Sequence, residues 1–228
     1  MTIEAIQGAR VHMRLADRQH AGEILRPLLR RGTTGLPVVI GIGAGGLAVA
    51  ASARRPGAPL GALAVAEFGL PDPLHPASAT GAVSTGGRTL LRVPAFEQLV
   101  ADSARVGVAI RRARQALVAS RLPGGHTGPG VAGRDVVLVD DGTSSTSQLA
   151  AARDFVRRGR PLSVTVALAC APRERIIEIE RFAGDVVVAL VPTWSEWFHW
   201  HGRLYESDVL PSPSEVTSLL RPSGSEEP

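Results

Sequence analysis

The chain has 228 residues, 44% of them hydrophobic, and a formal net charge of +4. This composition can bury one substantial core, so we expect a single domain over residues 1–210 and a flexible Ser/Pro/Glu-rich tail at 211–228. All 25 basic residues are arginine. The charge therefore reflects residue usage, and nucleic-acid binding is disfavoured.

Cellular location and redox chemistry are also restricted by the sequence. Every apolar stretch is interrupted before it reaches the length of a membrane span, and the first residues lack the apolar region of a signal peptide. We therefore expect a cytoplasmic protein with no membrane partner. Cys170 is the one cysteine, which excludes an intrachain disulfide and a cysteine metal site and predicts a buried thiol.

The first half of the chain alternates between helical and extended patterns. The predicted elements are a helix at 14–31, a strand at 37–42, a short helix at 46–54, a strand at 60–66, a hairpin of 81–85 and 88–93 about Gly86 and Gly87, and a helix at 94–120. Two glycines between alternating runs are typical of a hairpin turn.

The second half continues the alternation. After a Gly/Pro loop at 121–133, we predict strands at 135–140, 162–170 and 185–190 and helices at 144–158 and 172–182. Apolar strands that alternate with helices indicate a parallel sheet of about five strands covered on both faces. Gly43, Glu67 and Asp140 follow or end predicted strands, so they should face one crevice at the carboxyl edge of the sheet.

The most informative motif begins at the strand Val136–Val139. This apolar run ends in Asp140 and Asp141, and the following residues are Gly142, Thr143, Ser144, Ser145, Thr146 and Ser147, after which a helical pattern starts. The backbone N–H groups at a helix N-terminus suit a phosphate, and adjacent carboxylates suit vicinal hydroxyls. The motif predicts a sugar-phosphate site. A polar turn with a serine N-cap is the simpler alternative.

A second glycine-rich loop, GIGAGG at 41–46, lies between a predicted strand and a predicted helix. It fits G-x-G-x-x-G, and Glu67 follows about 20 residues later, where a dinucleotide-binding domain carries its ribose acid. An NAD-binding oxidoreductase is therefore an alternative. A tight structural turn would explain the same glycines.

The segment VVLVDDGTSSTSQ resembles the phosphoribosyl-pyrophosphate loop of the type I phosphoribosyltransferases. The resemblance implies that fold, with a small hood, and assigns Asp140 and Asp141 to the ribose as catalytic residues and 142–147 to the phosphate. Thr146 and Gln148 depart from the family's usual glycine and threonine. In one poorly characterised branch, a pyrophosphate-binding loop corresponds to Gly43, Ala44, Gly45 and Gly46. The similarity covers roughly residues 30–220.

Several departures from that branch change the charge of the site, and most of them remove positive charge. Ala44 replaces an arginine, Ala66 and Glu67 replace an Arg-Lys pair, and Ala77 replaces the glutamate of a His-Pro-Glu sequence. No lysine is present to compensate. Because cations stabilise the departing pyrophosphate, these substitutions predict weakened transfer. Substitution of the lost cations by Arg88, Arg92, Arg111 or Arg112 is the alternative.

The aromatic residues gather near the C-terminus. Trp197 and Trp200 lie in the segment that resembles the family's base-binding hood, so we assign them to substrate binding by stacking; core packing is the alternative. His199 and His201 alternate and would share a face in an extended segment. A metal pair there has no third ligand, and packing is favoured.

The predicted function is binding of phosphoribosyl pyrophosphate or a related ribose 5-phosphate ligand, with transfer to an unidentified acceptor. By resemblance, Mg²⁺ would bridge the diphosphate and solvent without a direct protein ligand. A non-catalytic nucleotide or sugar-phosphate sensor is the second candidate, and a homodimer is left open.

Overall fold

The computed structural model describes residues 14–29, 35–69, 81–84, 89–91, 103–118, 120, 122, 126–127, 129–142, 146–199 and 204–221. Its main sheet has the strand order β6-β2-β1-β7-β8-β9. These strands are β1 (Val38–Ile42), β2 (Leu60–Leu63), β6 (His126–Thr127), β7 (Asp135–Asp140), β8 (Ser163–Cys170) and β9 (Asp185–Leu190). Five strands are parallel, and β6 pairs antiparallel with β2. The predicted α/β fold with about five parallel strands is confirmed.

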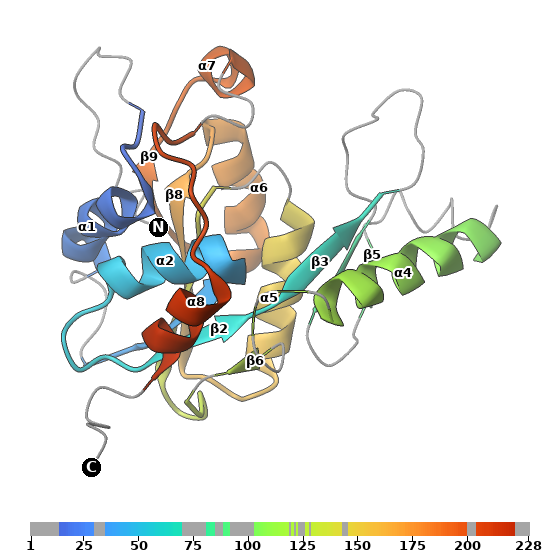
Figure 1. Cartoon of the computed structure of the whole chain (residues 1–228), viewed down its shortest axis with the longest axis horizontal. Coiled ribbons are helices and arrows are strands. Elements are labelled where there is room, and N and C mark those ends of the chain that lie inside the picture. The colour runs from blue at the N-terminus through green and yellow to red at the C-terminus, as the bar shows by residue number, and fades with distance from the viewer. Residues whose placement is uncertain are drawn as a thin grey trace.

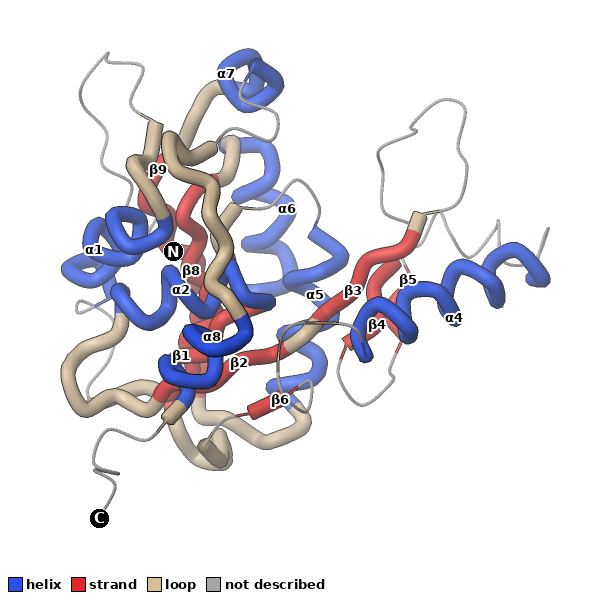
Figure 2. The backbone as a smooth tube through the Cα atoms, in the orientation of Figure 1, coloured by secondary structure: helices blue, strands red, loops and turns tan. Residues whose placement is uncertain are grey.

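Helices cover both faces of this sheet, as Figures 1 and 2 show. One face packs against α1 (Arg18–Leu29), α2 (Gly43–Ala53) and α8 (Pro213–Leu220), and the other against α5 (Thr146–Arg157) and α6 (Arg173–Ala183). Alternate residues of each strand face opposite ways. Val137 and Val139 therefore join the first core, and Val136 and Leu138 the second. This two-sided burial explains the continuous apolar runs of the central strands.

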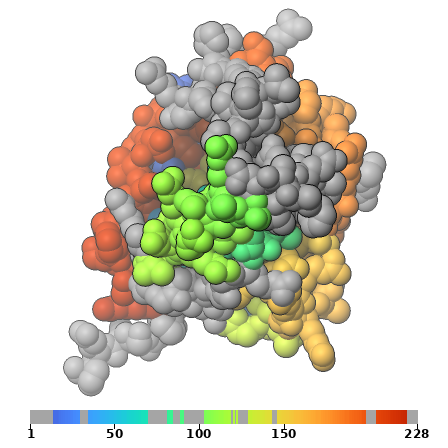
Figure 3. All heavy atoms as spheres, turned by 90° about the vertical axis from the view of Figure 1, so that its right-hand side faces the viewer, coloured from blue at the N-terminus to red at the C-terminus, as the bar shows by residue number. Residues whose placement is uncertain are grey.

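A smaller unit projects from the main sheet. It consists of the antiparallel strands β3 (Val65–Phe68), β4 (Gly81–Ser84) and β5 (Thr89–Leu91), with α4 (Ser103–Val118) packed on them through Phe68, Val83 and Ala113. The predicted hairpin is thus confirmed as the β4–β5 pair. Figure 3 looks onto this unit from the right-hand side of Figure 1 and shows α4 in green at the front. The unit also packs against α5, which leads away from the Asp140 motif.

Two boundaries differ from the sequence-based expectation in this region. The strand expected at 60–66 is two strands, because the chain leaves the main sheet at Ala64 and enters the small sheet as β3. The loop expected at 121–133 contains the short strand β6, which is held by pairing with β2. Both differences come from tertiary pairing, which local sequence pattern does not report.

The expected flexible tail is also corrected. Helix α8 occupies Pro213–Leu220, inside the segment predicted to fray from Pro211. A capping box in which Ser212 and Glu215 exchange hydrogen bonds starts it, and Pro213 stands in its first turn. The buried side chain of Val216 anchors the helix against α2 and β2. In the described part of the chain, no helix is long and apolar enough to cross a membrane.

Candidate functional site at the end of strand β7

The candidate site lies where the strand order reverses. Helix α2 follows β1 on one face and α5 follows β7 on the other, so the carboxyl ends of β1 and β7 open between them. Crevices of this kind are where open α/β sheets bind ligands. The structure therefore brings the two predicted motifs, residues 43–46 and 140–147, to one place, although 143–145 lie outside the described residues.

The glycines after β1 allow this close approach. A Cβ atom on Gly45 would lie 2.0 Å from Asp141 Oδ2, and one on Gly46 would lie 2.6 Å from the carbonyl oxygen of Val139. Any side chain at Gly45 or Gly46 would therefore push α2 away from β7. Gly45 and Gly46 let the start of α2 pack directly against the end of β7, next to the Asp141 carboxyl. The GIGAGG pattern alone did not distinguish this packing role from ligand binding.

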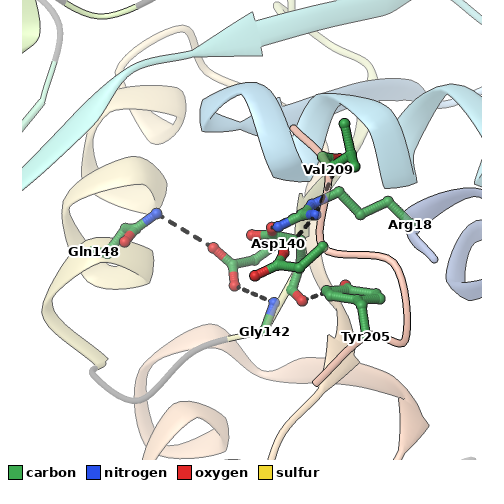
Figure 4. Close-up of polar contacts among 8 residues, drawn as sticks. Arg18, Asp140, Gly142, Gln148, Tyr205 and Val209 are labelled. Carbon is green, nitrogen blue, oxygen red and sulfur yellow. Dashed lines mark hydrogen bonds and ion pairs between the residues drawn. The ribbon is translucent and has the colours of Figure 1, made fainter. Parts of the chain in front are cut away.

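Asp140 is buried, with 2% of its surface exposed. Its Oδ1 accepts the backbone N–H of Gly142 at 2.9 Å, and its Oδ2 accepts Nε2 of Gln148 at 3.3 Å (Figure 4). Burial, and next the charge of Asp141, raises the pKa of Asp140 to about 8, with Glu67 adding to the rise and the Gly142 N–H opposing it. Asp140 therefore carries its proton over much of the neutral pH range.

Asp141 has a different environment, dominated by Arg18 of α1. Its Oδ2 accepts Nε and Nη2 of Arg18 at 2.8 and 2.7 Å. Burial raises the pKa of Asp141, and the charge and hydrogen bonds of Arg18 oppose that rise. Two adjacent carboxyls are thus set apart by their surroundings, one paired with a cation and one without, which is the usual way to give two acids different roles.

Arg18 is itself held in place on all sides. Its Nη1 contacts Asp208 Oδ1 at 2.8 Å and the carbonyl oxygen of Val209 at 3.3 Å, and its guanidinium lies 4.7 Å from the centre of the Tyr205 ring. Figure 4 shows Arg18 and Tyr205 on the side opposite Gln148. The Tyr205 hydroxyl donates to the carbonyl oxygen of Asp141. Burial, and next the charge of Asp141, raises the pKa of Tyr205, so this hydroxyl stays protonated.

These contacts join the two ends of the described chain over the site. Leu15 forms a parallel bridge with Tyr205, and the N–H groups of Glu206 and Ser207 donate to Leu15 and Ala16 at 2.9 and 2.8 Å. Sequence reasoning missed Arg18, Tyr205 and Gln148 as parts of the site. Arg18 precedes Asp141 by 123 positions, and no local pattern links the two.

The remaining predicted residues have mixed positions. Thr146 and Ser147 are buried in the first turn of α5, and Ala44 packs partly buried against the first core. Trp197, in α7 (Trp194–His199), is 7% exposed and belongs to that core. Packing therefore accounts for most of its surface. Trp200 and His201, and the side chain of His199, lie outside the described residues.

The dinucleotide interpretation placed Glu67 at the end of the second parallel strand. That strand, β2, ends at Leu63, and Glu67 lies in β3 of the small sheet. Its Oε1 accepts the backbone N–H of Gln148, at the start of α5, at 3.2 Å. The ribose-acid assignment of Glu67 is therefore wrong, and with it the main support for NAD binding. Glu67 does face the Asp140 crevice, as predicted.

Comparison with known proteins agrees with this geometry. The chain is 31% identical to TT1426 of Thermus thermophilus, whose crystal structure superposes with a TM-score of 0.69 over 91% of this chain and 98% of that one. It is 28% identical over 207 residues to a Mycobacterium tuberculosis protein named "putative phosphoribosyl transferase", and covers 46% of that protein. These likenesses agree with the resemblance of the Asp140 motif to the type I phosphoribosyltransferases. It spans about half the length of the curated relatives that it matches, and no family model matches it.

The role of Arg18 predicts a stability effect. R18M keeps an apolar stem but leaves Asp141 without its cation, so the free energy of unfolding should fall by about 2–4 kcal/mol, slightly less than for a fully buried pair. Urea denaturation with an unchanged m-value would measure this. The control D208N removes only the more exposed contact and should cost less than about 1 kcal/mol. Equal losses in the two variants would contradict the assignment.

The raised pKa of Asp140 predicts a pH dependence. Because the folded-state pKa of about 8 lies above the ordinary 3.8, unfolding releases a proton between these values. The free energy of unfolding should therefore decrease from about pH 4 to pH 8, by up to about 1.4 kcal/mol per pH unit, and then level off. D140N should lose most of this slope, whereas D185N, at an exposed position, should keep it. A slope that survives in D140N would refute the shift.

Proposed function

We propose that this chain is a phosphoribosyltransferase-family protein that binds phosphoribosyl pyrophosphate or a related ribose 5-phosphate ligand at the carboxyl end of β7. One observation carries the proposal: Asp140 and Asp141 lie beside the first turn of α5, at the point where the strand order reverses. The carboxyls suit the two ribose hydroxyls, and the N–H groups of the helix start suit the 5-phosphate.

The free lone pairs fit a ribose. In the described part of the chain, Arg18 is the one residue other than Asp141 itself that donates to this carboxyl, and it does so at Oδ2, so we assign Oδ1 to a ribose hydroxyl. Both oxygens of Asp140 already have one partner each, Gly142 and Gln148, and a carboxyl that carries its proton still offers one O–H donor and its remaining acceptor positions. Vicinal hydroxyls could therefore be held without breaking the contacts that orient the two acids.

Transfer would break the C1–oxygen bond to pyrophosphate and form a bond from C1 to the acceptor, whose proton leaves to solvent. Positive charge develops on the ribose during this step, and the Asp141 carboxylate is placed to stabilise it. The pyrophosphate takes the bonding electron pair and needs cations. Arg18 cannot supply one, because Asp141 and Asp208 hold it.

We propose that Mg²⁺ enters this site as an ion carried by the ligand. Among the described residues, no group of three or more His, Cys, Asp or Glu side chains could hold a metal. Mg²⁺ is commonly bound through substrate phosphates with several waters retained. It would then neutralise diphosphate charge beside Asp140 and Asp141 without a protein cage.

Ligand binding can be tested by thermal shift and calorimetry with ribose 5-phosphate, AMP and Mg²⁺-phosphoribosyl pyrophosphate. A ligand at 100 times its Kd should add about 2.7 kcal/mol to the free energy of unfolding. The D140N/D141N double variant should lose the effect, and D185N should retain it. A stabilisation that persists in the double variant would place the ligand elsewhere.

Turnover is expected to be weak with ordinary bases. Ala44, Ala66 and Glu67 put no cation near the departing pyrophosphate, and each missing charge contact can cost about 10²–10³ in rate. Pyrophosphate release should be near background with adenine, guanine, hypoxanthine, uracil and orotate. A rate of about 10 s⁻¹, typical of enzymes, with any base would contradict this.

A non-catalytic sensor of a nucleotide or sugar phosphate is the second candidate. Two observations that argue against efficient transfer favour it. Glu67 places a carboxylate at the start of α5, and Arg18 is already paired with Asp141 and Asp208. Ligand binding that depends on Asp140 and Asp141, with no turnover of the bases, would support it.

A further inference from the structure

Glu67 occupies the position where an anion would bind to α5. Its Oε1 accepts the backbone N–H of Gln148 at 3.2 Å, although the two residues are 81 positions apart. Helix α5 begins at Thr146, so Gln148 is its third residue. The first N–H groups of a helix have no acceptor within the helix, and these are the donors that a phosphate uses.

The contact between Glu67 and Gln148 is fixed by the packing of the small sheet on α5. Glu67 lies in β3, which pairs with β4, and both strands pack against α5. The small sheet therefore delivers the carboxylate to a helix of the main unit. Gln148 lies between two acids, with its backbone N–H on Glu67 and its side chain on Asp140 at 3.3 Å.

In the described part of the chain, the charge of Glu67 is not balanced by an ion pair. Among the described residues, no arginine forms an ion pair with Glu67, and its charge is one of the causes that raise the pKa of Asp140. Because Glu67 is exposed, it can turn into solvent at little cost when another anion arrives. A phosphate bound at α5 would then still experience a neighbouring negative charge.

We propose that Glu67 is a specificity-determining residue that imitates the ligand phosphate: it caps α5 in the free chain, must be displaced by the 5-phosphate, and disfavours ligands in proportion to their negative charge. This inference rests on the proposed function, because it concerns the same phosphate position. It predicts a site that prefers ribose 5-phosphate to free phosphoribosyl pyrophosphate, and that accepts the latter better with Mg²⁺ bound.

The substitution E67Q separates charge from shape. Glutamine keeps the acceptor oxygen for the Gln148 N–H and removes only the charge. By calorimetry at low salt, E67Q should bind ribose 5-phosphate about three- to tenfold more tightly than wild type, and phosphoribosyl pyrophosphate with a larger gain. The gain should shrink at about 0.5 M salt, where charges are screened. E23Q, which removes one exposed carboxylate from α1, should match wild type.

Each outcome bears on a different claim. Equal affinities of E67Q and wild type, with binding still lost in D140N/D141N, would overturn this inference and leave the proposed function intact. Weaker binding by E67Q would also overturn it, since Glu67 would then assist the ligand. If neither wild type nor E67Q binds either ligand, both the inference and the proposed function fail. E67K, which reverses the charge, should exceed E67Q in affinity if the inference holds.

Discussion

Burial of two adjacent carboxyls at the end of β7 is the constraint on which much of this structure depends. An ion removed from water costs several kcal/mol unless partners replace its hydration. Three residues hydrogen-bond the two carboxyls: Arg18 from α1, Gly142 from the strand end and Gln148 from α5. Tyr205, from the C-terminal segment, holds the backbone carbonyl of Asp141. Because Arg18 also contacts Asp208 and Val209, satisfying Asp141 joins the two ends of the described chain. The contacts of Arg18 therefore both pair Asp141 and hold the N-terminal helix against the C-terminal segment.

That arrangement has a consequence for chemistry. A guanidinium that neutralises Asp141 and Asp208 is structurally committed, so the cation nearest the acids cannot also serve a departing diphosphate. Asp140 is left without a cation and retains its proton instead. Under the proposed function, two oriented carboxyls would face the ribose, and the diphosphate would depend on a cation that the ligand brings.

The sequence predicted the parts of this site that are local. The apolar run ending in Asp140 and Asp141 identified strand β7, and the turn to a helical pattern identified α5. It could not identify Arg18, since the helix 18–29 reads only as amphipathic and its partner is 123 positions away. Helix α8 could have been found: Ser212, Pro213 and Glu215 form a capping-box pattern, which was outweighed by the surrounding Ser/Pro composition.

The break at Ala64 shows most clearly why the rest was not predictable. Residues 60–66 were expected to form one strand, and nothing in the local sequence indicates that the chain changes sheets within it. Had the run continued along β2, Glu67 would stand at the carboxyl edge of the main sheet, where a dinucleotide fold carries its ribose acid. By pairing with β4 instead, the same carboxylate reaches the first turn of α5. One change of hydrogen-bonding partner thus moves an acid from a position that would bind a ribose to one that competes with a phosphate.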